Sequence, residues 1–479
     1  MDRIESIAQT LLDGFDRHYS LFRKISSTAK IHFEESAWSE TRHDNRERIR
    51  MYELRVRETV SNIEEHFPET RSDYELWPRI KRAYIGLLLE HLQPECAETF
   101  YNSVACRVLD RRYYRNDYIF WRPALNTDNL EGSGETYRCY YPGKSGLRRC
   151  LAGMLVDAGL KCRFEDLRRD IRRLEHALRE QQPGHWRQMP NYQLQVLDSL
   201  FFRNKAAYMV GRQINGDQVQ PLIIPLLKNH EGQLLVDTVL TRHKDASILF
   251  SFTRAYFMAD MEVPSACVSF LKSIMPTKST VDLYAIMGLQ KHAKTLFYRQ
   301  MQHHLKHSSD NFEIAPGIPG TVMMVFTLPS FPFFFKIIKD RFDPPKVTDR
   351  GHVKNCYSLV KFHDRVGRLA DTLEYSLVAI PLNRVDPELL AELERTVAGS
   401  IENDGDKLVI RHCYIERLMV PLNQFLASAD TRLVKKEIND YGMAIRDLAG
   451  ANIFPGDMMQ KNFGVTRLNR VVFYDYDEI

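Results

Sequence analysis

Two aspartates and an asparagine near the end of the sequence stand at intervals that suit phosphoryl transfer. Asp457 precedes Asn462 by five positions, and Asp475 follows Asn462 by 13 positions, at the end of the apolar run 471–474. The catalytic loop of protein kinases has the same Asp-x₄-Asn interval, and an Asp after a later strand holds magnesium there. We therefore expect Asp457 to orient a hydroxyl group, and Asn462 and Asp475 to hold Mg²⁺ across the phosphates of a nucleotide.

The neighbours of these residues depart from the usual kinase pattern. Pro455 and Gly456 replace the His-Arg pair that normally precedes the catalytic Asp. Tyr476 and Asp477 follow Asp475 in place of Phe-Gly. Asp477 is thus a further carboxylate beside the expected metal ligand.

A glycine-bearing turn lies upstream in residues 315–321, and an apolar strand over residues 322–326 is predicted to follow it. Glycine lets the backbone approach phosphates closely because no Cβ intrudes. The spacing is not G-x-G-x-x-G, so an ordinary turn before a strand is the alternative for this feature taken alone.

Lys336 ends the aromatic run 333–335 in the next predicted strand, which a turn at residues 328–330 joins to the first. A charge flanked by so much apolar surface needs a partner. In kinases a lysine one strand after the glycine-bearing loop holds the α- and β-phosphates, and we expect that role here. The alternative is a lysine on an edge strand that points to water. Glu374, which we expect on one helix with Asp371, is a candidate partner of Lys336, and the alternative is that Glu374 lies at the surface.

Residues 408–423 are predicted to run from a strand through an extended connector into the start of a helix. Two-lobed kinases cross from the small lobe to the large lobe in this way, with backbone groups of the connector facing adenine. Any strand followed by a helix would produce the same pattern, so this feature supports the kinase interpretation only together with the others.

Helical periodicity dominates much of the remaining sequence. Apolar residues recur at three-and-four spacing over residues 4–15 and again over 167–178, where arginines make a basic outer face. We interpret that face as solvated surface, and the alternative is an anion or partner contact. Residues 222–240 predict a strand, a turn and a second strand, and Asn215-Gly216 predicts a hairpin turn.

The predicted fold class is α+β. We expect a mostly helical domain over residues 1–310, with a small β-sheet near residues 205–240, and a two-lobed kinase-like domain over residues 311–479. The boundary follows from the polar residues that crowd just before it. His303 and His307 are four apart and could share a metal, but no Glu lies between them, and a solvated helix face is the better interpretation.

The composition is that of a soluble globular chain of roughly three domains' size. Its 479 residues include 66 Lys and Arg against 62 Asp and Glu, a formal charge of +4, which is far below the basic excess of proteins that coat nucleic acid. No stretch reaches the ~18 apolar residues that span a bilayer, and the N-terminus does not read as a secretory signal, so we expect a cytoplasmic protein without nucleic-acid or membrane partners. The eight cysteines lack zinc-knuckle spacing, which favours reduced thiols.

Four stretches of the sequence together resemble the isocitrate dehydrogenase kinase/phosphatase family, namely residues 315–339, 363–372, 414–417 and 452–479. The resemblance implies a bifunctional bacterial enzyme that phosphorylates a serine of isocitrate dehydrogenase and removes the same phosphate. That activity diverts carbon between the citric acid cycle and the glyoxylate bypass. The resemblance also implies ATP (ADP in the phosphatase direction) and Mg²⁺ as cofactors. It further implies that the helical part, residues 1–310, is a regulatory domain from which AMP acts as an allosteric effector, and it allows a homodimer.

The resemblance assigns roles to individual residues. Asp371 matches the family's active-site acid, Asp457 is the catalytic-loop acid, and Lys336 pairs with the nucleotide phosphates. Asn462 and Asp475 hold the metal, and Asp477 is expected to position a water or hydroxyl group in the reverse, phosphatase direction. The phosphate cradle consists of Ala315, Pro316, Gly317, Ile318, Pro319, Gly320 and Thr321. The residues beside the nucleotide at the connector are Glu416, Leu418 and Met419.

The sequence departs from the family in two places. Pro319 stands where the family usually has a basic residue, and proline has no N–H to donate to a phosphate. The family continues past Ile479 by a helical segment that completes the large lobe. We therefore expect a small lobe over residues 311 to about 420 and a truncated C-lobe that begins at residue 421.

Two other functions stay open at this point. With an incomplete lobe, the chain could be a catalytically incomplete nucleotide-binding regulatory module that holds AMP or ATP without turnover. A small-molecule kinase of the aminoglycoside type is a weaker alternative, because the long helical first part does not suit such an enzyme.

Overall fold

The computed structural model contains two compact units. It describes residues 2–110, 117–127, 130, 132, 136–181, 187–250, 257–316, 320–342, 348–363, 367–477 and 479, and only the backbone of Arg42 and of residues 361–363. The first unit is formed by residues up to 250 and from 257 to 296, and the second by residues from 297 onward. The first is mainly helical and the second is rich in antiparallel strands, which confirms the predicted α+β fold class.

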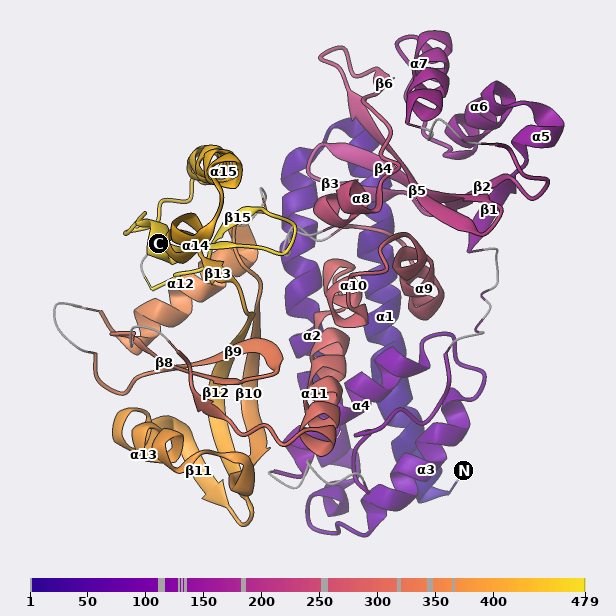
Figure 1. Cartoon of the computed structure of the whole chain (residues 1–479). Coiled ribbons are helices and arrows are strands. Elements are labelled where there is room, and N and C mark those ends of the chain that lie inside the picture. The colour runs from indigo at the N-terminus through magenta and orange to yellow at the C-terminus, as the bar shows by residue number, and fades with distance from the viewer. Residues whose placement is uncertain are drawn as a thin grey trace. The chain divides into compact units, whose positions relative to one another are not determined.

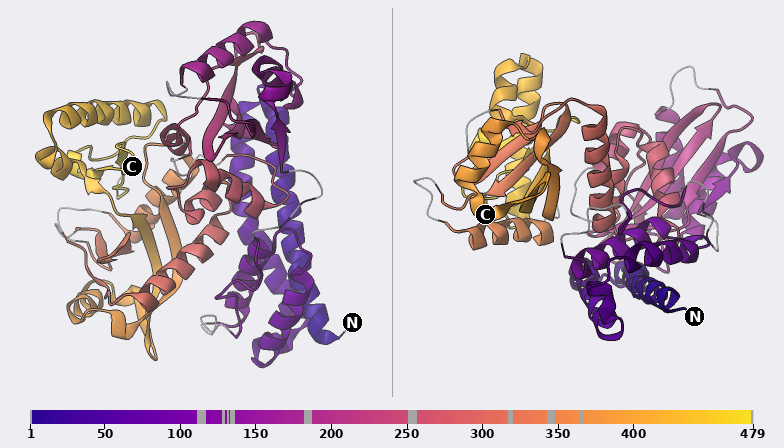
Figure 2. Two further views of the ribbon diagram at one scale, coloured as in Figure 1. Left: turned by 45° about the vertical axis from the view of Figure 1, so that its right-hand side comes forward. Right: turned by 90° about the horizontal axis from the view of Figure 1, so that it is seen from below.

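Long helices begin the first unit. They are α1 (Arg3–Glu35), α2 (Trp38–His66), α3 (Leu76–Leu88) and α4 (Pro94–Val108), with the 3₁₀ turn η1 (Pro68–Arg71) between α2 and α3. The predicted helix over residues 4–15 is the first part of α1, and its apolar face is buried. Glu5 accepts the Asp2 N–H at 3.0 Å, which caps the start of α1. Figures 1 and 2 show α1 and α2 side by side.

A six-stranded antiparallel sheet follows these helices. Its strands are β1 (Tyr137–Tyr140), β2 (Gln193–Leu197), β3 (Phe201–Arg203), β4 (Ala206–Asn215), β5 (Gln218–Lys228) and β6 (Leu234–Val236). They pair in the order β1-β2-β4-β5-β6, and β3 also pairs with β4. The predicted hairpin turn at Asn215-Gly216 joins β4 to β5, with the φ angle of Gly216 at 67°.

This sheet is larger than predicted. It begins at residue 137 rather than near residue 205. The sequence of β1 has no alternating apolar pattern, since none of its four residues is fully buried. The strand predicted over residues 234–240 is wrong beyond Val236, where regular pairing with β5 ends. Leu240 makes only an isolated bridge to Ile223.

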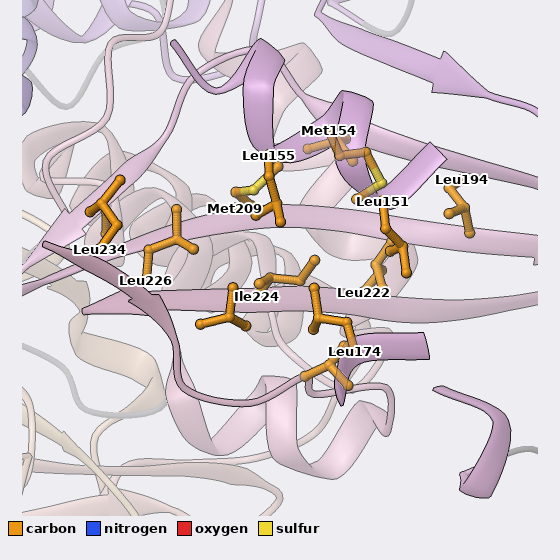
Figure 3. Close-up of a cluster of buried hydrophobic side chains, with 14 of the residues drawn as sticks. Leu151, Met154, Leu155, Leu174, Leu194, Met209, Leu222, Ile224, Leu226 and Leu234 are labelled. Atoms are coloured by element: carbon orange, nitrogen blue, oxygen red, sulfur yellow. The ribbon is translucent and has the colours of Figure 1, made fainter. Parts of the chain in front are cut away.

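Helices α6 (Leu147–Asp157) and α7 (Leu167–Glu180), preceded by the short α5 (Pro142–Ser145), pack apolar side chains against the sheet. Figure 3 shows side chains from α6 and α7 gathered in one cluster with side chains from β2, β4, β5 and β6. The labelled members are Leu151, Met154, Leu155, Leu174, Leu194, Met209, Leu222, Ile224, Leu226 and Leu234.

The predicted helix over residues 167–178 is α7, and its basic side is at the surface. Arg168, Arg172 and Arg173 are exposed. Arg169 donates to Glu165 at 2.8 Å, so part of this charge is already neutralised within the unit.

Further helices complete the first unit and lead into the second. They are α8 (His243–Leu249), α9 (Pro264–Ile274), α10 (Thr280–Ile286) and α11 (Gln290–His307). The division between the units falls within α11, after Leu296. His303 and His307 are exposed on α11 with ring centroids 4.1 Å apart. Within the described residues, no group of three or more His, Cys, Asp or Glu side chains is arranged to hold a metal.

The second unit is built on another six-stranded antiparallel sheet. Its strands are β7 (Glu313–Ile314), β8 (Met323–Leu328), β9 (Phe331–Ile338), β10 (Thr372–Pro381), β11 (Ile401–Asp404) and β12 (Lys407–Arg417). They pair in the order β10-β12-β9-β8-β7, with β11 on β12. The strands predicted on either side of the turn at residues 328–330 are confirmed as the β8–β9 hairpin.

Helices and a small second sheet complete this unit. The helices are α12 (Arg350–His363), α13 (Pro387–Thr396), α14 (Leu422–Ser428) and α15 (Thr431–Gly450), with 3₁₀ turns η2 (Leu382–Arg384), η3 (Ala398–Ser400) and η4 (Gln460–Asn462). The small sheet has the order β13 (Val420–Pro421), β14 (Phe463–Val465) and β15 (Val471–Phe473). Ile338, Val353, Leu448 and Phe473 belong to one buried cluster, so β9, α12, α15 and β15 share a core.

All eight cysteines are free thiols, and five of them are buried. Among the described residues, no helix combines the length and apolar character needed to cross a bilayer.

Candidate active site

A buried ion pair joins two neighbouring strands of the second sheet. Lys336 lies on β9 opposite Tyr414 of β12, and Glu416 lies two residues further along β12 on the same face. The Lys336 Nζ and Glu416 Oε2 atoms are 2.6 Å apart, and their side chains are only 11% and 3% exposed. Because β9 is paired on both sides, by β8 and β12, the edge-strand alternative for Lys336 is wrong.

The charge of Lys336 is stabilised by several carboxylates. Burial by itself lowers the pKa of this ammonium group, but Glu416 opposes that effect, with smaller contributions from Asp475 and Asp477, and the net result is a raised pKa. Lys336 therefore stays charged at neutral pH. Asp475 and Asp477 must lie close enough to Lys336 to act on it electrostatically.

The predicted partner of Lys336 is wrong. Glu374 does not lie on a helix with Asp371 but on strand β10, where its Oε1 atom is 3.1 Å from Nε2 of His412. The helix that precedes β10 is α12, and its sequence contains no Asp or Glu. This helix instead contributes Tyr357, whose ring stacks on Tyr414 with centroids 3.9 Å apart. The carboxylate that pairs with the lysine thus comes from the sheet itself.

The glycine-bearing turn joins β7 to β8. Ala315 donates its N–H to the Val325 carbonyl at 3.1 Å, which closes the base of the turn. A Cβ on Gly320 would lie 2.9 Å from the Met323 carbonyl oxygen, so a larger residue would force the backbone to move. Pro316 and Gly320 are exposed and Thr321 is half-buried. The other predicted members of the cradle, Gly317, Ile318 and Pro319, lie outside the described residues.

The connector is shorter than predicted. Residues 414–417 continue β12, so Glu416 is a buried strand residue and not part of an extended crossing. The crossing begins at Leu418, which is 48% exposed and donates its N–H to the Pro332 carbonyl at 2.9 Å. Met419 follows and packs against Gly464 of β14. Leu418 and Met419 thus stand at the junction of the two sheets.

The catalytic-loop residues lie between the end of α15 and β14. Asp457 is half-buried, and its Oδ1 atom accepts the Met459 N–H at 2.9 Å. Asn462 is 5% exposed and donates its side-chain N–H to the Asp457 carbonyl at 3.2 Å. These bonds hold Asp457 and Asn462 as one local unit.

The segment after β15 joins this loop to Lys336. The Tyr474 N–H donates to the Asn462 carbonyl at 3.1 Å, and the Tyr474 hydroxyl donates to the Lys461 carbonyl. The Lys336 ammonium lies over the Tyr474 ring, 5.4 Å from its centroid. Asp475 directly follows Tyr474, so these contacts bring Lys336, Asn462 and Asp475 together.

The segment that precedes Asp371 pairs with the segment that precedes Asp475. Leu369 forms a parallel bridge with Phe473, and the Ala370 N–H donates to the Phe473 carbonyl at 2.8 Å. The buried Tyr476 hydroxyl donates to the Ala370 carbonyl at 2.5 Å. Asp371 and Asp475 therefore follow two segments that run side by side.

The donor set of this site fits Mg²⁺. Magnesium in nucleotide sites usually takes one or two carboxylates together with substrate phosphates, so a cage made wholly of protein groups is not required. Asp475 and Asp477 supply carboxylates, and both act on Lys336. Because the Asn462 amide nitrogen donates to Asp457, the amide oxygen is the atom that remains for a metal. Asn462 and Asp475 are thus the residues that would hold the ion.

Sequence reasoning overlooked two features of the site. One is the ion pair of Glu416 with Lys336. Glu416 follows the apolar run 413–415, and a charge beside an apolar run is the same pattern that singled out Lys336. The other is the way the neighbours of Asp371 and Asp475 are tied together. No local signal could show it, because the two segments are about a hundred residues apart in the sequence.

Comparison with known proteins gives matches over almost the whole chain. The family model for "Isocitrate dehydrogenase kinase/phosphatase (AceK), regulatory domain" matches residues 8–309, and the model for the kinase domain of the same family matches residues 310–479. An isocitrate dehydrogenase kinase/phosphatase of Burkholderia thailandensis is 53% identical over 477 residues, which are 99% of this chain and 79% of that protein. Its counterparts in Paraburkholderia xenovorans and Paraburkholderia phytofirmans are 53% and 52% identical, with 99% of this chain and 78% of each relative covered.

Proposed function

Because the chain belongs to the isocitrate dehydrogenase kinase/phosphatase family, we propose that it phosphorylates a serine of isocitrate dehydrogenase with ATP and removes the same phosphate. This activity would control the branch between the citric acid cycle and the glyoxylate bypass. The contacts that join Lys336 and Glu416 to the Asp457–Asn462 loop through Tyr474 are the observation that carries the proposal. They place a fixed positive charge beside carboxylates, as phosphoryl transfer requires.

Each site residue has a separate role in the forward reaction. Asp457, anchored by the Met459 N–H, accepts the proton of the serine hydroxyl as its oxygen bonds to the γ-phosphorus of ATP. The bond from that phosphorus to the bridging oxygen breaks, and ADP leaves. Lys336 neutralises negative charge on the phosphates, and Glu416 holds Lys336 in place. Mg²⁺ held by Asn462 and Asp475 would supply further neutralisation of the phosphate charge.

The phosphatase direction uses the same site residues with ADP bound. We propose that Asp477 positions a water molecule, whose oxygen forms the new bond to phosphorus while the serine oxygen leaves. Asp371, beside Asp475, is a second acid at this end of the site. The action of AMP from the first unit, a cytoplasmic location and a homodimer stay predictions.

The proposal is tested by transfer of labelled phosphate from ATP to isocitrate dehydrogenase. The variant Asp457→Ala should lose about two to four orders of magnitude in rate, the usual contribution of a general base. Asp406→Ala is the matched control, because the Asp406 side chain is 89% exposed in the same unit, and it should label at the wild-type rate. Equal labelling by Asp457→Ala and wild type would remove the role given to Asp457.

Calorimetric titration with ATP separates the remaining alternatives. Nucleotide binding without any transfer would favour a nucleotide-sensing module, whereas absence of binding would count against both functions. The small-molecule kinase alternative has no support from the comparisons, because both matching models belong to the protein-directed family named above.

A further inference from the structure

Arg368 is a fully buried arginine whose donors are engaged from several sides. Its Nη1 and Nη2 atoms form a fork with the Asp440 carboxylate at 3.0 and 2.9 Å, and its Nε atom donates to Asp447 at 2.9 Å. Both aspartates belong to α15. Nη1 also donates to the Val471 carbonyl at 3.0 Å. The side chain is 0% exposed, and these bonds fix the orientation of its guanidinium plane.

Asp440 extends this network to the backbone of β15. Its Oδ2 atom accepts the Val471 N–H at 2.7 Å. The first residue of β15 is therefore held at its N–H by Asp440 and at its carbonyl by Arg368. Burial alone raises the pKa of Asp440, but the hydrogen bonds from Arg368 and Val471 outweigh burial and lower it, so this carboxylate is ionised at neutral pH.

The main chain of Arg368 holds the other end of β15. Its carbonyl accepts the Phe473 N–H at 2.7 Å, and the next bond along runs from the Ala370 N–H to the Phe473 carbonyl at 2.8 Å. The side chain of Arg368 is thus hydrogen-bonded to β15 at Val471, and its backbone is hydrogen-bonded to β15 at Phe473. Asp371 lies three residues after Arg368, and Asp475 lies two residues after Phe473.

We propose that Arg368 is a positioning residue that sets the place of Asp371 relative to Asp475, and through Asp475 the affinity of the site for its divalent cation. This inference rests on the proposed function. A planar guanidinium in a fork fixes both distance and angle, which a lysine ammonium in the same place does not. Supporting residues behind a metal ligand commonly change metal affinity or activity by roughly 10- to 100-fold when they are replaced.

The alternative is that the network only stabilises the packing of α15. Arg470 offers a matched control, because it also lies beside Asp440, at 3.9 Å, and directly precedes Val471. Arg470→Lys leaves the fork of Arg368 intact. A purely structural role predicts that Arg368→Lys and Arg470→Lys differ only in thermal stability.

The test compares the full chain with Arg368→Lys and Arg470→Lys. Binding of Mn²⁺ in the presence of ADP is measured by electron paramagnetic resonance, and amide hydrogen exchange is followed in peptides that cover residues 368–371 and 471–477. Arg368→Lys should weaken Mn²⁺ binding by roughly 10- to 100-fold and speed exchange in both segments, while metal-free ADP binding stays unchanged. The Mg²⁺ concentration for half-maximal phosphate transfer should rise by the same factor. Arg470→Lys should behave like wild type.

Unchanged Mn²⁺ affinity in folded Arg368→Lys would overturn the proposal. If that variant does not fold, Asp447→Ala takes its place, since it removes the single bond from Arg368 Nε at a carboxylate that is 29% exposed. It should weaken Mn²⁺ binding in the same direction by a smaller factor, and unchanged affinity would again refute the role of Arg368. Failure of the proposed function looks different: wild type would label no isocitrate dehydrogenase, although Mn²⁺ binding would still depend on Arg368.

Discussion

Removal of the Glu416 carboxylate is the sharpest test of the buried pair with Lys336. Glu416→Leu leaves the Lys336 ammonium beside an apolar side chain in a place where only 11% of the lysine is exposed. A charge that loses its partner inside a protein destabilises the fold by about 3–5 kcal/mol. Asp475 and Asp477 still act on Lys336, which places the expected loss at the lower end, about 3 kcal/mol.

A double-mutant cycle isolates the interaction itself. Lys336→Met leaves Glu416 buried without its cation and should cost a similar amount. The double variant Lys336→Met/Glu416→Leu replaces the pair by apolar groups of similar volume, and such replacements are often neutral, so it should lie within about 1 kcal/mol of wild type. The free energies of unfolding of the single variants should therefore fail to add by several kcal/mol.

Denaturant unfolding measures these changes unit by unit. The sequence has no tryptophan after residue 186, and Trp38, Trp77 and Trp121 lie in the first unit, so tryptophan fluorescence is an internal control that should not respond to Glu416→Leu. Circular dichroism follows both units. In Glu416→Leu it should show the second unit unfolding at a lower urea concentration than in wild type. Additive single-variant effects, or a Glu416→Leu variant as stable as wild type, would refute the assignment of Glu416 as the partner of Lys336.

The pH dependence gives a second check with a defined sign. In wild type the pKa of Lys336 is raised above 10.5, so the stability from the pair is fully present below pH 10.5 and is lost as pH rises through the higher folded value. In Glu416→Leu, burial should lower the pKa of Lys336 in the folded state below 10.5. The stability that this variant lacks relative to wild type should then become smaller as pH rises toward 10.5, because the unfolded chain holds the proton more tightly.

Two further predictions concern the glycine-bearing turn and a buried acid of the first unit. Gly320→Ala should weaken ATP binding by about tenfold, equivalent to ~1.4 kcal/mol, because the added Cβ would lie 2.9 Å from the Met323 carbonyl oxygen. Gly442→Ala, at an exposed position of α15 with nothing within 4 Å of the new atom, is the control and should bind ATP normally in the same calorimetric titration. Glu95 has its pKa raised to about 7 by burial and by Glu98, so wild type should lose stability as pH rises from 4.5 to 7. Glu95→Gln should therefore stabilise the first unit by up to about 3 kcal/mol at pH 8, measured by tryptophan fluorescence, and a gain independent of pH would contradict this account.

Features that depend on neighbours along the chain were predictable. The β8–β9 hairpin around residues 328–330 and the helical faces of α1 and α7 follow from local periodicity and turn chemistry, and the structure contains them. The Asp457–Asn462 interval is of the same kind, because a short loop brings the two residues into contact through the bond from the Asn462 amide to the Asp457 carbonyl. The sheet that starts at residue 137 escaped prediction because its first strand has no buried face of its own.

The partner of Lys336 depends on strand order instead. Glu374 and Glu416 follow Lys336 by 38 and 80 residues, and both end up in the same sheet. Only the pairing of β12 between β9 and β10 puts Glu416 within 2.6 Å of the lysine and leaves Glu374 to His412. Spacing along the chain sets which chemical groups a short loop can present, because the backbone between them has few conformations. Which distant groups meet depends on the register of strands that pack on a shared core. The free energy that selects this register comes from contacts between segments, so no single segment reveals it.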